Sequence, residues 1–241
     1  MSQSINPSLS TKTLGLIGLL SILQGLLISI PTIVLGAAIN WPDSLDYSAS
    51  QLLPNLIDQE AAVRFGYISY LIYSILFVVA IFMLTKLSAG KAMAAMFGII
   101  MAFAIASTVA RSIGIVRWLV PMPQLAESWT SATTDQERFA ISVAYDSLNL
   151  FGGTVGEVLG VSIFAALSLL ALSIAFLRDG LPKWIGTFGL VAVAALLITT
   201  TELMGFEPNS VVIVFGTTMI QLWFLALGLW LLFKAARVKS A

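Results

Sequence analysis

Residues 66–85 of the chain read GYISYLIYSILFVVAIFMLT, a stretch of twenty residues without one charged side chain. A helix of about 20 residues is long enough to cross the hydrocarbon core of a bilayer. The whole chain has the same character, since 59% of its 241 residues are hydrophobic and only 10% are charged, whereas soluble domains carry about 25% charged residues. A soluble fold of this length could not cover so much apolar surface, so the composition predicts a membrane protein.

Six apolar segments of this kind follow one another along the chain. We expect an all-α, polytopic membrane protein that forms one domain over residues 1–241, with six transmembrane helices. Gln24 and Pro31 lie in the first span, where the proline predicts a kink near residues 27–31. The expected spans cover about residues 14–38, 66–85, 92–110, 153–177, 182–201 and 210–233.

The distribution of Lys and Arg beside the spans predicts the orientation of the helices. Cytoplasmic loops carry an excess of these residues. One side of the predicted bundle has eight of them and the other has four, so we expect both termini in the cytoplasm. The eight are Lys12, Lys86, Lys91, Arg178, Lys183, Lys234, Arg237 and Lys239, and the four are Arg64, Arg111, Arg117 and Arg138.

In this topology the two longest connections, residues 40–64 and 114–138, both lie on the outer side. Connections that are longer than the geometry requires are often functional. We also expect a helical extension before the fourth span, from about Asp135, although Gly152 and Gly153 leave its continuity with the span open. The elaborated face of the protein is therefore expected to point away from the cytoplasm.

Small residues at intervals of four predict a close contact between the third and fourth spans. In lipid, where no hydrophobic effect drives association, such residues let helix backbones approach each other. We expect the third span, through Gly98 and Ala102, to pack against Gly152, Gly156 and Gly160 of the fourth. The complete stripe in the third span is Ala94, Gly98, Ala102, Ala106 and Ala110.

Several polar residues are expected at one depth, near the outer boundary of the hydrocarbon. Arg111 lies twenty residues beyond Lys91 and Glu157 lies twenty-one residues before Arg178, which is about 30 Å in each case at a helical rise of roughly 1.5 Å per residue. The predicted polar layer consists of Arg64, Tyr67, Tyr70, Arg111, Glu157 and Glu202.

Charged groups at this depth usually turn toward the bundle and pair with one another. Because Arg111 and Glu157 lie at matching heights on two helices expected to be neighbours, we predict an ion pair between them. Two interpretations stay open: a purely structural pair, or a polar cavity, open to the outside, that binds a small polar ligand or ion. In the second case Arg117, Asp146 and Gln24 are expected to line or cap the cavity.

The composition excludes several kinds of chemistry. The chain has no Cys and no His, which excludes disulfides, thiol nucleophiles and histidine-ligated zinc or haem. We expect no cofactor and no resident metal, although a cation site made of carboxylates alone stays possible. The 12 basic and 12 acidic residues balance, and no basic tract indicates nucleic acid. No nucleophile elbow, phosphate-binding loop or pair of catalytic carboxylates is present, so we do not expect an enzyme.

Three segments resemble a known family. They are residues 13–20 (TLGLIGLL), residues 64–66 (RFG) at the start of the second span, and residues 180–186 (GLPKWIG) at the start of the fifth. Together with the order of the six spans, they are similar to the bacterial membrane family called domain of unknown function 4386, over about residues 11–233. The resemblance implies a six-helix bacterial membrane protein and assigns no activity and no functional residue.

These observations lead to one main functional hypothesis and two alternatives. The main one is a protein of the bacterial cytoplasmic membrane that binds a small ligand, a lipid or a membrane protein partner at the outward-facing polar layer, for transport or for membrane-linked regulation. The first alternative is an embedded enzyme that acts on a lipid or lipid-linked substrate. The second is a structural subunit of a membrane complex.

Overall fold

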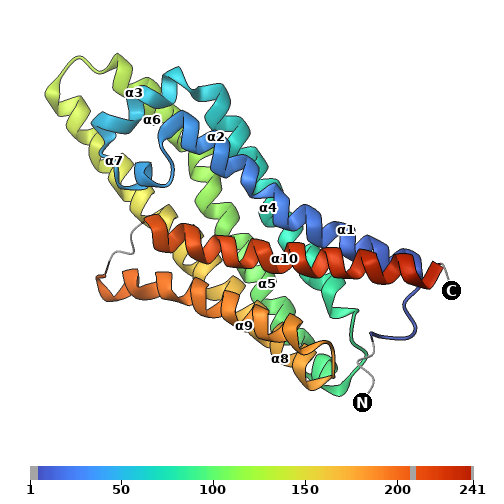
Figure 1. Ribbon diagram of the computed structural model, residues 1–241. Coiled ribbons are helices and arrows are strands. Elements are labelled where there is room, and N and C mark those ends of the chain that lie inside the picture. Colours follow the sequence, from blue (N-terminus) through green and yellow to red (C-terminus); the bar gives the residue numbers. More distant parts are fainter. Residues whose placement is uncertain (1–4, 207–209, 240–241) are drawn as a thin grey trace.

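The computed structural model describes residues 5–206 and 210–239, and this part consists of helices joined by short connections, without strands (Figure 1). Six of its helical segments are long and apolar enough to cross a membrane, which confirms the predicted fold class. The start of the first helix and the end of the last lie at the same end of the bundle. Which end faces the cytoplasm stays a prediction from the charge distribution, and we name the end that carries both termini the inner end and the opposite end the outer end. The six segments are Thr11–Ile39, Glu60–Thr85, Lys91–Ser131, Asp135–Arg178, Lys183–Thr201 and Val211–Arg237.

The first span is kinked, as predicted. It consists of α1 (Thr11–Leu27) and α2 (Ser29–Ile39), which meet at Ile28. The ring of Pro31 removes a backbone donor and crowds the carbonyl four residues earlier, which is Leu27. The predicted position of the kink is therefore confirmed by the break between the two helices.

The second and third spans extend further at their outer ends than the sequence predicted. They are α4 (Glu60–Thr85) and α5 (Lys91–Leu119), which follow each other through a short inner connection. The helices continue past residues 66 and 110, where the predicted spans ended, and include Arg64 and Arg111. A charged residue does not stop a helix, and here Arg111 is buried inside the bundle.

The fourth span is one long helical rod that includes the predicted extension. It consists of α7 (Asp135–Gly153), η2 (Thr154–Ala165) and α8 (Ala166–Arg178). The two glycines at its centre do not interrupt it. Instead, the helix widens there into a π-helix, a form that is rare and is frequently found at functional sites.

The last two spans complete the bundle. They are α9 (Lys183–Ile198), which continues into the short 3-10 helix η3 (Thr199–Met204), and α10 (Ser210–Lys239). α10 lies along α1 on one side and along α9 on the other. Side chains of α1, α4, α5, α8, α9 and α10 share the main apolar core, with Phe77, Leu169 and Trp223 fully buried in it.

The two outer connections are folded helices rather than the expected loops. They contain η1 (Asp43–Asp46) and α3 (Ala49–Asp58) in the first connection and α6 (Pro121–Ser131) in the second. Together with the first half of α7 these elements form an outer cap beyond the ends of α9 and α10 (Figure 1). The cap has a second apolar core that includes Leu52, Met122 and Tyr145. Short amphipathic helices became stable here because they bury their apolar faces against one another.

The contact predicted between the third and fourth spans exists, but different residues of α5 make it. Gly98 and Ala102 are exposed, and a side chain added at Gly98 would meet nothing within 4 Å. Gly114 lies at the contact and faces Gly152 and Gly156, and of the predicted stripe Ala110 lies there too, beside Gly156 and Gly160. A spacing of four advances about 400° at roughly 3.6 residues per turn, so the predicted stripe winds around α5 and cannot stay on one face.

At the inner end, Asp179 holds two connections together. Its carboxylate accepts hydrogen bonds from the backbone N–H groups of Ala92 (3.0 Å) and Met93 (2.9 Å), in the first turn of α5, and from the hydroxyl of Ser88 (2.6 Å). A carboxylate at a helix N-terminus satisfies free donors and complements the helix dipole. The connection between α8 and α9 is thereby tied to the one between α4 and α5.

Candidate functional site

A polar cavity lies at the outer end of the bundle, between α4, α5 and η2, beneath the cap. We call it the outer cavity, and its volume is about 20 Å³. A cleft of about 40 Å³ adjoins it and runs between η2, α9 and α10. The two share Trp41, Tyr70 and Glu157. The outer cavity is lined by Trp41, Tyr67, Tyr70, Arg111, Gly114, Ile115, Trp118, Gly156 and Glu157.

Close backbone contact between α5 and η2 positions the charged side chains. A Cβ atom at Gly114 would lie 2.8 Å from the carbonyl oxygen of Gly152 and 2.8 Å from the Cα atom of Gly156. A Cβ atom at Gly160 would lie 2.8 Å from Cγ of Arg111. Only glycine leaves space for these approaches, so the glycines of η2 bring Glu157 next to the arginines of α5.

Arg111 forms the deep end of the outer cavity. It is only 3% exposed, and its guanidinium lies over the rings of Phe77 and Tyr73, at 4.5 and 5.5 Å from their centroids. Nε donates a long hydrogen bond of 3.4 Å to the carbonyl oxygen of Ser107. Its Nη2 atom has no hydrogen-bond partner in the described part of the chain. The guanidinium of Arg111 is thus surrounded largely by aromatic rings, and its Nη2 donor lacks a hydrogen-bond acceptor.

The predicted ion pair has a different basic member. Among the residues that the structure describes, Glu157 pairs with Arg117 rather than with Arg111, and Nη2 of Arg117 lies 3.5 Å from Oε1 of Glu157. The side chain of Arg117 is 5% exposed and that of Glu157 is 37% exposed. α5 continues past Arg111, and Arg117, about 1.7 turns further along at roughly 3.6 residues per turn, lies beside Gly152 and Gly153 of the fourth span.

Arg117 also has unused donors. Its Nε and Nη1 atoms are buried and without a hydrogen-bond partner among the described residues. Its guanidinium lies 5.4 Å from the ring centroid of Trp118. An arginine carries five N–H donors, and the contact with one carboxylate oxygen satisfies few of them.

Aromatic side chains form the wall of the outer cavity opposite η2. Tyr67 stacks on Trp118 with ring centroids 5.1 Å apart and an angle of 4° between the planes. The hydroxyl of Tyr67 is buried and finds no partner in the described chain. Tyr70 lines both the outer cavity and the adjoining cleft. The predicted tyrosines therefore do lie beside Arg111 and Glu157.

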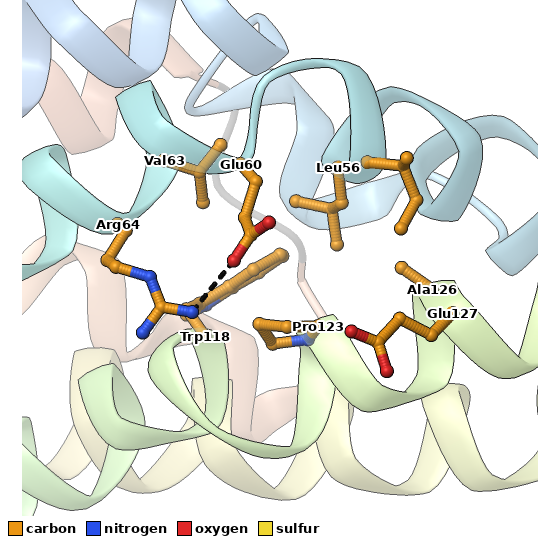
Figure 2. Close-up of a pocket in the computed structure, with 9 residues that line it drawn as sticks. Leu56, Glu60, Val63, Arg64, Trp118, Pro123, Ala126 and Glu127 are labelled. Atoms are coloured by element: carbon orange, nitrogen blue, oxygen red, sulfur yellow. Dashed lines mark hydrogen bonds and ion pairs between the residues drawn. The ribbon is translucent and has the colours of Figure 1, made fainter.

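Arg64 is separated from this group. It lies on the other side of Trp118, in a second surface pocket that Figure 2 shows, and its Nη2 atom is 2.8 Å from Oε1 of Glu60. Both side chains are about half exposed. Glu127 of α6 also lines this pocket. The predicted polar layer is thus split between two pockets that share Trp118: Arg64 lines one of them, whereas Tyr67, Tyr70, Arg111 and Glu157 line the other.

Three further predicted residues have other positions. The side chain of Glu202 lies outside the described residues. Gln24 is buried and donates a 3.4 Å hydrogen bond from Nε2 to the carbonyl oxygen of Tyr73. Asp146 is exposed. Neither Gln24 nor Asp146 belongs to the described lining of the outer cavity or of the adjoining cleft.

The structure adds lining residues that the sequence did not indicate. Trp41 reaches the site from the connection after α2, and Ser162 and Thr199, which hydrogen-bond each other, line the adjoining cleft. The hydroxyl of Ser162 also donates to the carbonyl oxygen of Glu157, five residues earlier, at 3.1 Å. A relation over five residues is typical of a π-helix, and no sequence pattern here predicted that widening. In the described part of the chain, no group of three or more Asp and Glu side chains is arranged to hold a metal ion.

Comparison with known proteins gives one match. The family model described as "Domain of unknown function (DUF4386)" covers residues 16–235. No curated protein and no solved structure matches the chain significantly.

Proposed function

Because the chain belongs to the family of unknown function DUF4386, no known activity guides the assignment, and we propose from the geometry that this protein binds a small polar ligand, or the polar group of a lipid, in the outer cavity. Binding takes place from the side opposite the cytoplasm. Transport or membrane-linked regulation would be its use, in the bacterial cytoplasmic membrane.

One observation supports this proposal above the others: Arg111 and Glu157, from two candidate membrane spans, line one cavity, and a second arginine, Arg117, pairs with that glutamate. Arg111 and Arg117 are buried, and Glu157 faces the cavity from η2. Ionisable groups at membrane depth are costly and generally mark a functional site. A structural pair needs one group of each sign and no cavity, whereas here a third charged group and an open space are present.

The size of the space limits what enters it. A buried water requires a volume of roughly 10–15 Å³ on this measure, so the outer cavity of about 20 Å³ and the cleft of about 40 Å³ each accept a few waters. Pockets for drug-sized molecules are larger, at about 300–1,000 Å³. The ligand is therefore small, or only one end of it is inserted.

Cysteine labelling tests this proposal directly, because the chain contains no cysteine of its own. We would introduce Glu157→Cys or Thr217→Cys, which line the cleft, and Val109→Cys as a control that is 54% exposed on the outside of α5. A charged, membrane-impermeant methanethiosulfonate is then added to spheroplasts of a bacterial host.

We expect both cleft thiols to react from the outside, because water reaches them, while the thiol at position 109 faces lipid and does not react. If neither cleft position reacts, or if both react only after the cytoplasmic side is opened, the proposed outward-facing site is wrong.

A further inference from the structure

We infer that the group bound in the outer cavity is an oxyanion, a carboxylate or a phosphate, held between Arg111 and Arg117. This inference rests on the proposed function and names the chemical class of its ligand. It follows from the sign of the charge in the cavity, from the free donors and from the walls of the adjoining cleft.

The first argument is the balance of charge. Arg111 and Glu157 line the outer cavity, and Arg117 pairs with Glu157 beside it. These three described side chains together carry two positive charges and one negative charge, which leaves one positive charge in excess. A buried charge without a counterion is strongly unfavourable. An anion that enters the cavity supplies the missing charge, whereas a cation would increase the imbalance.

The second argument is the direction of hydrogen bonding. Nη2 of Arg111 and Nε and Nη1 of Arg117 are all buried donors without a partner among the described residues. The buried hydroxyl of Tyr67 is likewise without one. The guanidinium group only donates, and its fork geometry matches the oxygens of carboxylates and phosphates. Unpaired donors therefore lie in the lining of the cavity, on Arg111 and Tyr67, and next to it on Arg117. A ligand that satisfies them must bring acceptors.

Existing contacts do not remove this requirement. The ring faces of Phe77 and Tyr73 attract the guanidinium of Arg111, but Nη2 of this group still has no hydrogen-bond partner among the described residues. Glu157 reaches Arg117 at 3.5 Å only, longer than the roughly 2.7–2.9 Å of a strong charge-assisted hydrogen bond. An incoming oxyanion can therefore form shorter contacts than the protein itself provides.

The third argument concerns the body of the ligand. The adjoining cleft begins at Glu157 and Tyr70 and is lined further on by the apolar side chains Val158, Val161 and Leu196. An oxyanion in the outer cavity that carries an apolar chain would place that chain along this wall. An anionic lipid has this form, while a free phosphate or carboxylate uses the polar end alone.

Thermal unfolding of the full-length protein in a nonionic detergent tests the inference and distinguishes the two sources. One arm titrates sodium phosphate against sodium chloride at equal ionic strength. The other titrates phosphatidylglycerol against phosphatidylcholine in mixed micelles. A ligand that binds the folded state raises the midpoint by an amount that depends on its concentration relative to Kd. Stabilisation by phosphate indicates a free oxyanion, and stabilisation by phosphatidylglycerol alone indicates a lipid.

Four variants give the inference its sharpest test. Arg111→Met and Arg117→Gln each remove donors, and we expect Kd to rise about tenfold or more, as for the loss of a hydrogen bond to a charged group. Arg64→Gln is the matched control, because this arginine pairs with Glu60 on the far side of Trp118, and its Kd should not change.

Glu157→Gln works in the opposite direction and does not depend on a buried arginine being replaceable. It removes the competing carboxylate and frees Nη2 of Arg117, so we expect the anion to bind several-fold more tightly. The inference is overturned if this variant binds the anion more weakly, or if phosphate and phosphatidylglycerol stabilise the wild type no more than their controls. In that case cysteine labelling of the cleft can still succeed, and the proposed function would stand without an anionic ligand.

Discussion

The contact between Gly114 of α5 and the glycines of η2 predicts a large effect from a single methyl group. In Gly114→Ala the new Cβ atom would lie 2.8 Å from both the carbonyl oxygen of Gly152 and the Cα atom of Gly156. Carbon atoms pack comfortably at about 3.5–4.0 Å, so the two helices must separate by roughly 0.7 Å or more. Overpacking of this kind costs about 1–3 kcal/mol.

Gly98→Ala on the same helix is the matched control. Its Cβ atom would meet nothing within 4 Å, and both variants gain the same helix propensity, about 1 kcal/mol for alanine over glycine. The difference between the two variants therefore isolates the cost of the contact. At about 2–4 °C per kcal/mol for a chain of this length, we expect Gly114→Ala to melt roughly 2–12 °C below Gly98→Ala in detergent. If both variants melt at the same temperature, the close contact that positions the charged residues does not exist.

Two further substitutions test other parts of the structure by the same measurement. Asp179→Ala removes the acceptor of three hydrogen bonds at the inner end, and the free energy of unfolding should fall by about 2 kcal/mol, the upper range for loss of a helix N-cap. Asp179→Asn keeps one acceptor oxygen, so its free energy of unfolding should fall less. If Asp179→Ala is as stable as the wild type, these hydrogen bonds do not hold the two connections together. Tyr67→Phe removes a buried hydroxyl without a described partner and keeps the stack on Trp118, so the unfolding midpoint should stay the same or rise, whereas a clear fall would show that this hydroxyl has a protein partner.

The membrane fold was predictable from the sequence because the bilayer imposes a strong and local requirement. Each span must be long and apolar, and the kink at Ile28 followed from a single proline. The outer cap was not predictable in this way. Helices α3 and α6 are short and are stabilised by burying residues such as Leu52 and Met122 against each other, and this depends on contacts between segments far apart in the chain.

The candidate site was predicted in part for the same reason. Depth along a helix follows from its rise, and four residues of the predicted polar layer, Tyr67, Tyr70, Arg111 and Glu157, line one cavity. Rotation about the helix was less certain. The π-helical turn of η2 and the continuation of α5 decide that Arg117 pairs with Glu157, and neither feature has a signal in the residues themselves.

The most direct test of the oxyanion site is an experimental structure of the full chain in nanodiscs that contain phosphatidylglycerol. The account predicts an anionic group in the outer cavity, within about 3.2 Å of the guanidinium nitrogens of both Arg111 and Arg117. A structure in which the two arginines are fully paired with groups of the protein, and in which no space remains beside Glu157, would contradict it.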